Sequence, residues 1–321
     1  MGSARVALLV AVVIWGWTFV ATKVCLEQLS VAELLGLRLL VALPVLGAIA
    51  RGRGTPLFPR PVPRALVGGT LLITIHFLIQ ISGLRLTTAT RTGWIIAITP
   101  VVTAVLSALV LRERVTRRLV CGIAVATCGI LLLLSGGRPG GLAWSGAAGD
   151  WLILASAHTW ALYTIAIRNI TRTTAPLSVT IGVLAPPAAL LGLYALSRFD
   201  AARIVGLRVE TICALLFLGV FGTALAHWLW QVGVSRVGAA RAGVFLYLEP
   251  LSTTALAVPY LGETFGPSTL AGGAMVLLGV WIAERPSGSG GQSSNSANRS
   301  SSVRIPSRSS AISSSSCRTR W

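Results

Sequence analysis

The segment RTGWIIAITPVVTAVLSALVLRERVTRRLVCGIAVATCGI, residues 91–130, aligns without a gap with RAGVFLYLEPLSTTALAVPYLGETFGPSTLAGGAMVLLGV, residues 241–280. Ten of the 40 positions are identical, and shared hydrophobicity alone would not align the charged, glycine and proline residues among them. The clearest matches are Arg91/Arg241, Gly93/Gly243, Pro100/Pro250, Glu113/Glu263, Gly122/Gly272 and Gly129/Gly279. We infer that the chain contains an internal duplication.

The composition indicates that the duplicated unit lies in a membrane. Of 321 residues, 54% are hydrophobic and only 11% are charged, and the mean hydropathy is +0.78. A chain with this composition is far more apolar than ordinary soluble proteins. The net charge of +18 does not indicate a nucleic-acid partner, because the arginines fall mostly between apolar runs and near the C-terminus, without a continuous basic face.

Ten apolar runs come close to the roughly 20 residues that a helix needs to cross about 30 Å of hydrocarbon. The first is interpreted as a helix and not as a signal peptide, because no small-x-small cleavage site follows it before Lys23. The connections are too short to hold a soluble domain. We therefore predict an all-α integral membrane protein with ten transmembrane helices, at residues 5–22, 31–50, 65–84, 90–111, 118–136, 150–168, 177–197, 210–232, 240–260 and 267–284.

The duplication extends upstream of the quoted segments. The pattern His76-x-x-x-Gln80 matches His227-x-x-x-Gln231, and WGWTFVATK at 15–23 matches WALYTIAIR at 160–168 more weakly. The predicted repeats are therefore residues 1–136 and 137–284, with five spans each. Because five is odd, the second repeat must enter the membrane from the opposite side, and such inverted repeats are typical of secondary transporters.

Positive charge gives the predicted orientation. With a cytoplasmic N-terminus, 19 basic residues lie inside and 7 outside, and Arg38 remains within a helix. Both termini are then cytoplasmic. From Pro286 onward, 15 of 36 residues are Ser and 5 are Arg, so residues 285–321 are predicted to form a disordered cytoplasmic tail. The ratio of 26 Arg to one Lys suggests the inner membrane of a bacterium with a GC-rich genome.

The motif WGWTFVATK, Arg38 in the second run, and the Pro…Glu…Gly pattern that ends each repeat carry a family resemblance. Over residues 1–284 the chain resembles EamA-type members of the drug/metabolite transporter superfamily. The resemblance implies ten helices in two inverted repeats. It also implies alternating-access transport, commonly outward, of small metabolites or drug-like compounds such as amino acids. It does not identify the cargo.

Glu249 is the main candidate for a substrate-binding or proton-binding residue. It lies eight residues after Arg241, about 12 Å along a helix and so near the bilayer centre, where a charged carboxylate costs on the order of 2.5–3.5 kcal/mol. It could face a cavity, where it would bind a cationic group or exchange a proton. Alternatively, a protonated or paired Glu249 could hold helices together. Pro100 and Pro250 are predicted to kink their helices, but the residue before Pro100 is Thr99.

Other polar and aromatic residues within the runs have two interpretations. The pairs His76/Gln80 and His227/Gln231 each share one helical face and could bind substrate or link helices by hydrogen bonds. An aromatic cavity wall and a packed interior face are alternatives for His158, Tyr163 and Trp15.

Several remaining polar and small residues are interpreted structurally. A snorkelling role or an ion pair is expected for Arg38 and Lys23. A turn or capping role is expected for Glu113 and Glu263. Close helix packing is expected at Gly122, Gly129, Gly272 and Gly279.

Catalytic motifs do not occur in the sequence. We find no HExxH, GxSxG or P-loop pattern and no Cys/His ligand spacing, so we predict a protein that is not an enzyme, uses no metal or cofactor and is not driven directly by ATP. The expected function is an exporting secondary transporter with possible proton coupling. A channel-like permease and an uptake carrier remain alternatives. Expected partners are a small-molecule substrate and the lipid bilayer, and a homodimer is left open.

Overall fold

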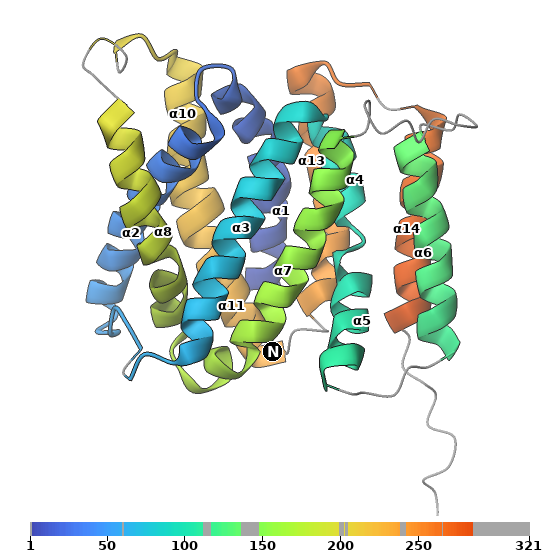
Figure 1. Cartoon of the computed structure of the whole chain (residues 1–321), viewed down its shortest axis with the longest axis horizontal. Helices are drawn as coiled ribbons and strands as arrows, with labels where there is room; N and C mark the ends of the chain where they lie inside the picture. The colour runs from blue at the N-terminus through green and yellow to red at the C-terminus, as the bar shows by residue number, and fades with distance from the viewer. Residues whose placement is uncertain are drawn as a thin grey trace, which may run out of the picture. The chain divides into compact units, whose positions relative to one another are not determined.

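The computed structural model describes residues 2–59, 61–111, 117–135, 148–198, 202, 205–237, 242–264 and 266–284. In this part of the chain every regular element is a helix and no strand occurs. Figure 1 shows the helices: α1 (Gly2–Leu26), α2 (Val31–Gly52), α3 (Arg64–Leu86), α4 (Ala89–Ile96), α5 (Thr99–Leu111), α6 (Arg117–Ser135), α7 (Ala148–Thr173), α8 (Pro176–Arg198), α10 (Val209–Phe217), η1 (Leu218–Leu225), α11 (Ala226–Val237), η2 (Val244–Leu248), α13 (Glu249–Leu261) and α14 (Pro267–Glu284). Glu113 and the predicted tail lie outside the described residues.

The predicted apolar runs fall on helical segments in the described residues, although the run at 90–111 is interrupted by a turn at residues 97–98. Within the described ranges, five helical segments are long and apolar enough to cross a membrane: α1, α2, α3, α8 and the continuous segment Val209–Val237. The outward faces of these helices are apolar; Leu190 and Leu193 of α8, for example, are 72% and 71% exposed. Exposed apolar side chains of this kind suit contact with lipid. The all-helical membrane fold predicted from composition is confirmed at this level.

Local sequence signals explain where several helices begin and end. Ser30 and Glu33 form a capping box at the start of α2: the Glu33 carboxylate accepts from the Ser30 N–H at 2.8 Å, and the Ser30 hydroxyl accepts from the Glu33 N–H at 3.4 Å. Gly262 ends α13 with a φ of 63°, a left-handed conformation that glycine adopts without a steric penalty. These caps fix the helix ends next to short connections.

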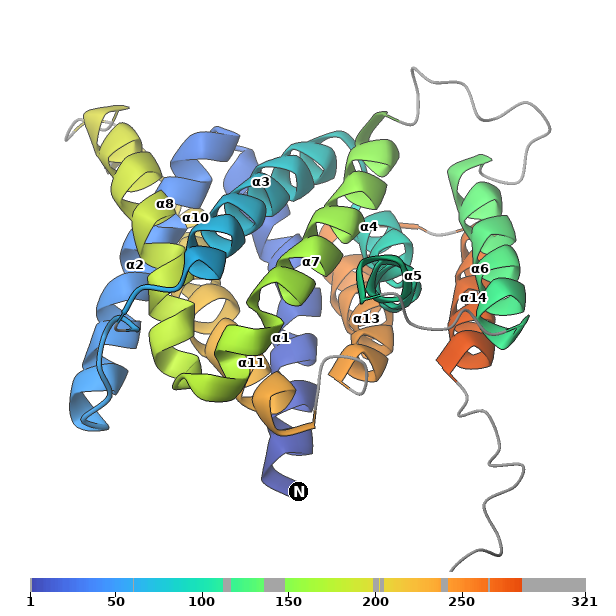
Figure 2. The same cartoon turned by 60° about the horizontal axis from the view of Figure 1, so that its bottom comes forward.

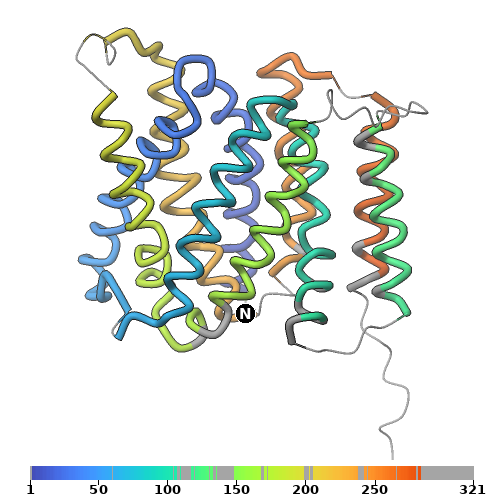
Figure 3. The backbone as a smooth tube through the Cα atoms, viewed as in Figure 1, coloured from blue at the N-terminus to red at the C-terminus, as the bar shows by residue number. Residues whose placement is uncertain are grey.

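The two prolines of the duplicated motif mark changes of helical segment. α4 ends at Ile96 and α5 begins at Thr99, so Pro100 is the second residue of α5. In the second half, the 3-10 helix η2 ends at Leu248 and α13 begins at Glu249, followed by Pro250. The first turn of a helix tolerates proline because its N–H would have no intrahelical partner there. The predicted kinks thus coincide with a turn between α4 and α5 and with a change of helix type between η2 and α13. Figure 3 shows the path of the backbone through the bundle.

The run predicted at 210–232 is not a uniform α-helix. Its middle part, η1, is a π-helix between α10 and α11. Two glycines allow neighbouring helices to approach it. A Cβ atom on Gly219 would lie 2.4 Å from Cγ1 of Val41, and one on Gly222 would lie 2.5 Å from Cγ2 of Thr18. π-helical turns are frequent at functional sites.

Helices from the two halves of the chain pack against each other in pairs. α2 lies against α8, α6 against α14, α4 against α13, α3 against α7 and α1 against α11 (Figures 1 and 2). In the α6–α14 pair, a Cβ on Gly129 would lie 2.6 Å from the Gly272 oxygen, and one on Gly279 would lie 2.6 Å from the Gly122 oxygen. The predicted role of these glycines in close packing is therefore confirmed.

Candidate functional site

A pocket in the interior of the bundle collects polar side chains from both halves of the chain. Its wall includes residues of α1, α2, α3 and α7 and the starts of α5, α11 and α13. Several of the lining residues are aliphatic or aromatic. The lining side chains that carry polar atoms are Trp15, Thr18, Thr22, Arg38, His76, Gln80, Thr99, Trp160, His227 and Glu249.

Glu249 brings a carboxylate to this pocket. It begins α13 immediately after η2, and its side chain and backbone together are only 5% exposed. Its backbone carbonyl accepts a hydrogen bond from the Thr253 hydroxyl at 2.8 Å. Within the described part of the chain, no hydrogen bond or ion pair reaches its carboxylate. The start of a helix favours a negative charge, but it does not replace a partner for a buried carboxylate.

His76 and His227 hold equivalent positions in the two halves and are both buried. The Nδ1 of His76 lies 3.0 Å from the carbonyl oxygen of Ser156, and that of His227 lies 3.1 Å from the carbonyl oxygen of Gly222. Because a carbonyl oxygen only accepts, Nδ1 must carry the proton in each ring. When the ring is neutral, Nε2 is then an acceptor. The Nε2 atom of His227 is buried and has no hydrogen-bond partner in the described structure.

Two tryptophans join these histidines in an aromatic cluster. The ring centroids of Trp15 and Trp160 are 5.2 Å apart, those of Trp15 and His227 are 5.1 Å apart, and those of Trp160 and His76 are also 5.1 Å apart. The Trp15 indole N–H also donates to the Gly222 carbonyl at 3.2 Å. The cluster forms a rigid apolar wall in which each half contributes one tryptophan and one histidine.

Arg38 also lines the pocket, although the sequence favoured snorkelling or an ion pair for it. The residue is 4% exposed, so the side chain does not snorkel to the surface. Its Nε donates to the Thr223 hydroxyl at 2.9 Å, and its guanidinium carbon lies 5.0 Å from the centre of the Phe77 ring. No ion pair involving Arg38 occurs among the described residues. The snorkelling interpretation of Arg38 is therefore wrong, and the described residues give no support to the ion pair.

The structure brings together five of the eight candidate residues, namely Trp15, His76, Gln80, His227 and Glu249. The others lie outside the pocket wall. Gln231 and Tyr163 are buried and bonded to each other, with Gln231 Nε2 donating to the Tyr163 hydroxyl at 3.0 Å. His158 is exposed, and its Nδ1 lies 2.9 Å from the Leu154 carbonyl oxygen of its own helix.

Thr18 and Thr22 line the pocket but were not singled out from the sequence. Together with Trp15 and Phe19 they occupy positions i, i+3, i+4 and i+7 of α1, so a helical-face argument could have found them. Arg38 and Thr99 were noted in the sequence, Arg38 as a charged residue within an apolar run and Thr99 as the residue before Pro100, but neither was predicted to line a pocket. No cluster of three or more His, Cys, Asp or Glu side chains suitable for a metal ion occurs in the described ranges.

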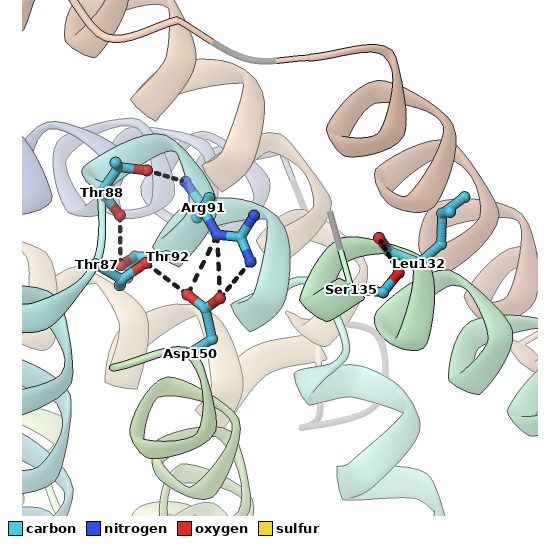
Figure 4. Close-up of polar contacts among 7 residues, drawn as sticks. All are labelled: Thr87, Thr88, Arg91, Thr92, Leu132, Ser135 and Asp150. Atoms are coloured by element: carbon cyan, nitrogen blue, oxygen red, sulfur yellow. Dashed lines mark hydrogen bonds and ion pairs between the residues drawn. The ribbon is translucent and has the colours of Figure 1, made fainter. Parts of the chain in front are cut away.

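At the upper end of the bundle in Figure 1, polar contacts join the two halves. Asp150 at the start of α7 forms an ion pair with Arg91 of α4 and accepts a hydrogen bond from the Thr87 hydroxyl (Figure 4). The Glu263 carboxylate accepts from the backbone N–H groups of Ala89 and Thr90, both at 2.8 Å. Glu263 therefore caps the first turn of α4, which confirms the capping role expected for it.

A second ion pair at this end is exposed. Glu27, after α1, pairs with Arg208, before α10. The hydrogen bond and the charge of the Glu27 carboxylate raise the pKa of the Arg208 guanidinium, which stays protonated. Gln28 strengthens the same connection by accepting from the Arg208 backbone N–H at 2.9 Å.

Polar and ionisable side chains that face a pocket within membrane helices mark substrate or ion pathways. The fold and the pocket thus define the chain as a multi-pass membrane protein of the transporter class. The model of the EamA-like transporter family matches residues 3–135 and 147–284, and the chain belongs to this family, within the drug/metabolite transporter superfamily.

Several relatives carry names that state a cargo. A Salmonella typhimurium protein named "Probable amino-acid metabolite efflux pump" is 30% identical, over 85% of this chain and 92% of its own length. A Streptantibioticus cattleyicolor protein named "Probable terminal-alkyne amino-acid exporter" is 31% identical, over 87% and 92%. The "Aromatic amino acid exporter YddG" of Ancylobacter novellus is 27% identical, over 68% and 74%. A solved crystal structure matches with a TM-score of 0.67 and 23% identity, over 88% of this chain and 96% of that one, and supports the fold alone.

Proposed function

We propose that this protein is a secondary transporter that exports amino acids or similar small metabolites by alternating access, in exchange for protons. The names of the amino-acid exporters among its relatives support the direction and the class of cargo. Uptake and channel-like permeation are the alternatives that the experiment below must separate.

The pairing of helices supports ten spans arranged as two inverted repeats, residues 1–136 and 137–284. α2 and α8 hold equivalent places in the two repeats, as do α6 and α14, and each of these helices packs on its own counterpart. α1 is equivalent to α7, and α3 is equivalent to α11. Exchanging the two repeats therefore turns the α1–α11 pair into the α7–α3 pair, and both pairs are in contact. A two-fold axis in the membrane plane has this consequence, and the opposite directions of α2 and α8 in Figure 1 fit it.

The bias of basic residues supports an orientation with both termini in the cytoplasm. With this orientation, 19 Lys and Arg residues lie on the cytoplasmic side and 7 lie on the opposite side. In this orientation the upper end of Figure 1 faces away from the cytoplasm. We propose the bacterial inner membrane as the location, on the basis of the arginine-rich composition.

The single observation that carries the proposed mechanism is the unpaired carboxylate of Glu249 at the pocket wall. A carboxylate there can hold a proton or the ammonium group of an amino acid, but not both. Cargo enters from the cytoplasm when Glu249 is ionised and leaves on the far side when a proton replaces it. This competition couples export to proton entry.

The test is counterflow in proteoliposomes that contain the purified full chain. Vesicles are loaded with unlabelled phenylalanine, and uptake of labelled phenylalanine, leucine and alanine is followed. We expect saturable uptake that the internal amino acid accelerates. Unitary currents in planar bilayers would instead indicate a channel. If no amino acid is exchanged, the proposed cargo class is wrong. Where exchange is observed, a pH gradient imposed in one direction and then in the other distinguishes export from uptake by the direction of net amino-acid flux.

A further inference from the structure

Arg38 is a buried cation whose hydrogen-bonding capacity is mostly unused. A guanidinium carries five N–H donors, and within the described structure only Nε has a recorded acceptor, the Thr223 hydroxyl at 2.9 Å. The side chain has no carboxylate partner among the described residues and is 4% exposed. Because an unpaired charge inside membrane helices is costly, a ligand that supplies the missing anion is favoured.

Contacts from two elements, α3 and η1, hold the guanidinium in place. Phe77 of α3 stacks against it at 5.0 Å, and Thr223 of η1 fixes its Nε. The approach of η1 depends on Gly219, where an added Cβ atom would lie 3.1 Å from the backbone oxygen of Arg38. The π-helix therefore places Thr223 where it orients the fork of the guanidinium. An arginine held this way suits bidentate binding of a carboxylate.

The same pocket holds a charge of opposite sign and an apolar wall. Glu249 contributes a carboxylate without a hydrogen-bond or ion-pair partner among the described residues, and Trp15 and Trp160 contribute two rings packed edge to face, with an interplanar angle of 85°. A ligand that satisfies all three has a carboxylate, an ammonium group and an apolar side chain. We propose that Arg38 binds the carboxylate of a zwitterionic amino acid while Glu249 binds its ammonium group, so that Arg38 determines the requirement for a free carboxylate. This assignment rests on the proposed function, because it uses the same pocket.

The first test uses the wild-type protein and three compounds that share a phenyl group. Isothermal titration in detergent measures binding of phenylalanine, of phenylalaninamide, which lacks the carboxylate, and of 3-phenylpropionate, which lacks the ammonium group. We expect each analogue to bind about tenfold to a hundredfold more weakly than phenylalanine, because each loses one charge-assisted hydrogen-bonded pair. Equal binding of phenylalanine and its amide, or no binding of phenylalanine, overturns the inference.

The second test uses variants. The Arg38→Gln variant should bind phenylalanine only as tightly as it binds phenylalaninamide. Its affinity for phenylalaninamide should equal that of the wild-type protein. Thr223→Val keeps the charge but removes the acceptor for Nε, and it should reduce the preference for phenylalanine by severalfold. Arg85→Gln, at an exposed arginine of α3, is the matched control and should keep the wild-type preference. An Arg38→Gln protein that weakens both ligands equally contradicts carboxylate recognition.

Binding and transport fail in distinguishable ways. A protein that binds phenylalanine with a carboxylate preference but shows no counterflow contradicts the proposed transport function and supports the assignment of Arg38. A protein that exchanges amino acids and their amides equally supports the transport function and contradicts that assignment.

Discussion

At matching positions in the two halves, Thr99 begins α5 and Glu249 begins α13, and each precedes a proline. Both residues line the pocket. The Thr99 hydroxyl donates to the Ile96 carbonyl at 2.6 Å, whereas the Glu249 carboxylate has no recorded partner among the described residues. The comparison shows that the helical segment changes before the proline in both halves, while among the described residues that line the pocket the carboxylate comes from the second half.

The histidines differ between the halves in a related way. The His76 ring on α3 is hydrogen-bonded to the backbone carbonyl of Ser156 on α7. The His227 ring is hydrogen-bonded to the backbone carbonyl of Gly222, five residues earlier in the same continuous helical segment. The π-helix η1 occurs in the second half, and α3 is an uninterrupted α-helix. The second half thus carries both the carboxylate and the irregular backbone. We infer that both halves provide the chemistry of the pocket, because Glu249 and His227 come from the second half whereas Arg38, His76 and Gln80 come from the first.

The largest expected effect comes from replacing the residues that differ most between the halves. Glu249→Gln keeps the side-chain shape but removes the charge, so phenylalanine counterflow should fall by roughly tenfold to a hundredfold. Thr99→Val removes one neutral hydroxyl whose bond is local, and it should change counterflow by less than about tenfold. Initial rates in matched proteoliposomes give the comparison. If Thr99→Val is as damaging as Glu249→Gln, charge is not what separates the halves.

A smaller effect is expected at the ion pairs that join the halves. The side chain of Asp150 is 4% exposed, whereas that of Glu27 is 56% exposed. Asp150→Asn should lower the free energy of unfolding by about 2 kcal/mol, because a buried charge-assisted pair is weakened. Glu27→Gln should leave the melting temperature nearly unchanged, because water and salt screen an exposed pair. Thermal unfolding in detergent measures both. A larger loss for Glu27→Gln would contradict the burial argument.

The smallest effect concerns the two tryptophans. Trp15 and Trp160 make similar ring contacts, but only Trp15 has a recorded indole hydrogen bond in the described structure, to Gly222. Trp15→Phe should therefore cost about 1 kcal/mol more stability than Trp160→Phe. Unfolding of the two variants under the same conditions tests this difference. Equal losses would mean that the bond to the π-helix contributes nothing measurable.

Hydropathy and self-similarity predicted most of the helical fold because they depend on local sequence. The ten apolar runs and the packing glycines Gly129 and Gly279 follow from residue size and spacing alone. The π-helix could not be predicted in the same way. It contains Gly219 and Gly222, where Val41 and Thr18 approach closely, and contacts between distant segments are not visible in a hydropathy profile. Hydropathy reports that a run is apolar, but not which hydrogen-bond ladder it adopts.

The candidate site was predicted in part for the same reason. Glu249, His76 and His227 could be found because they are polar residues within apolar runs, two of them repeated. Arg38 was assigned a structural role because its sequence position does not reveal the contacts with Thr223 and Phe77. The exposure of His158 depends on the rotation of α7 and could not be read from the chain.

The most direct measurement follows protons in proteoliposomes that enclose a pH-sensitive dye. In the wild-type protein, adding phenylalanine to one side should drive protons towards that side as the amino acid crosses in the other direction. In Glu249→Gln, the amino acid should move no protons, even where some exchange persists. Wild-type vesicles in which phenylalanine crosses without proton movement would contradict the account, as would Glu249→Gln vesicles that move protons as the wild type does.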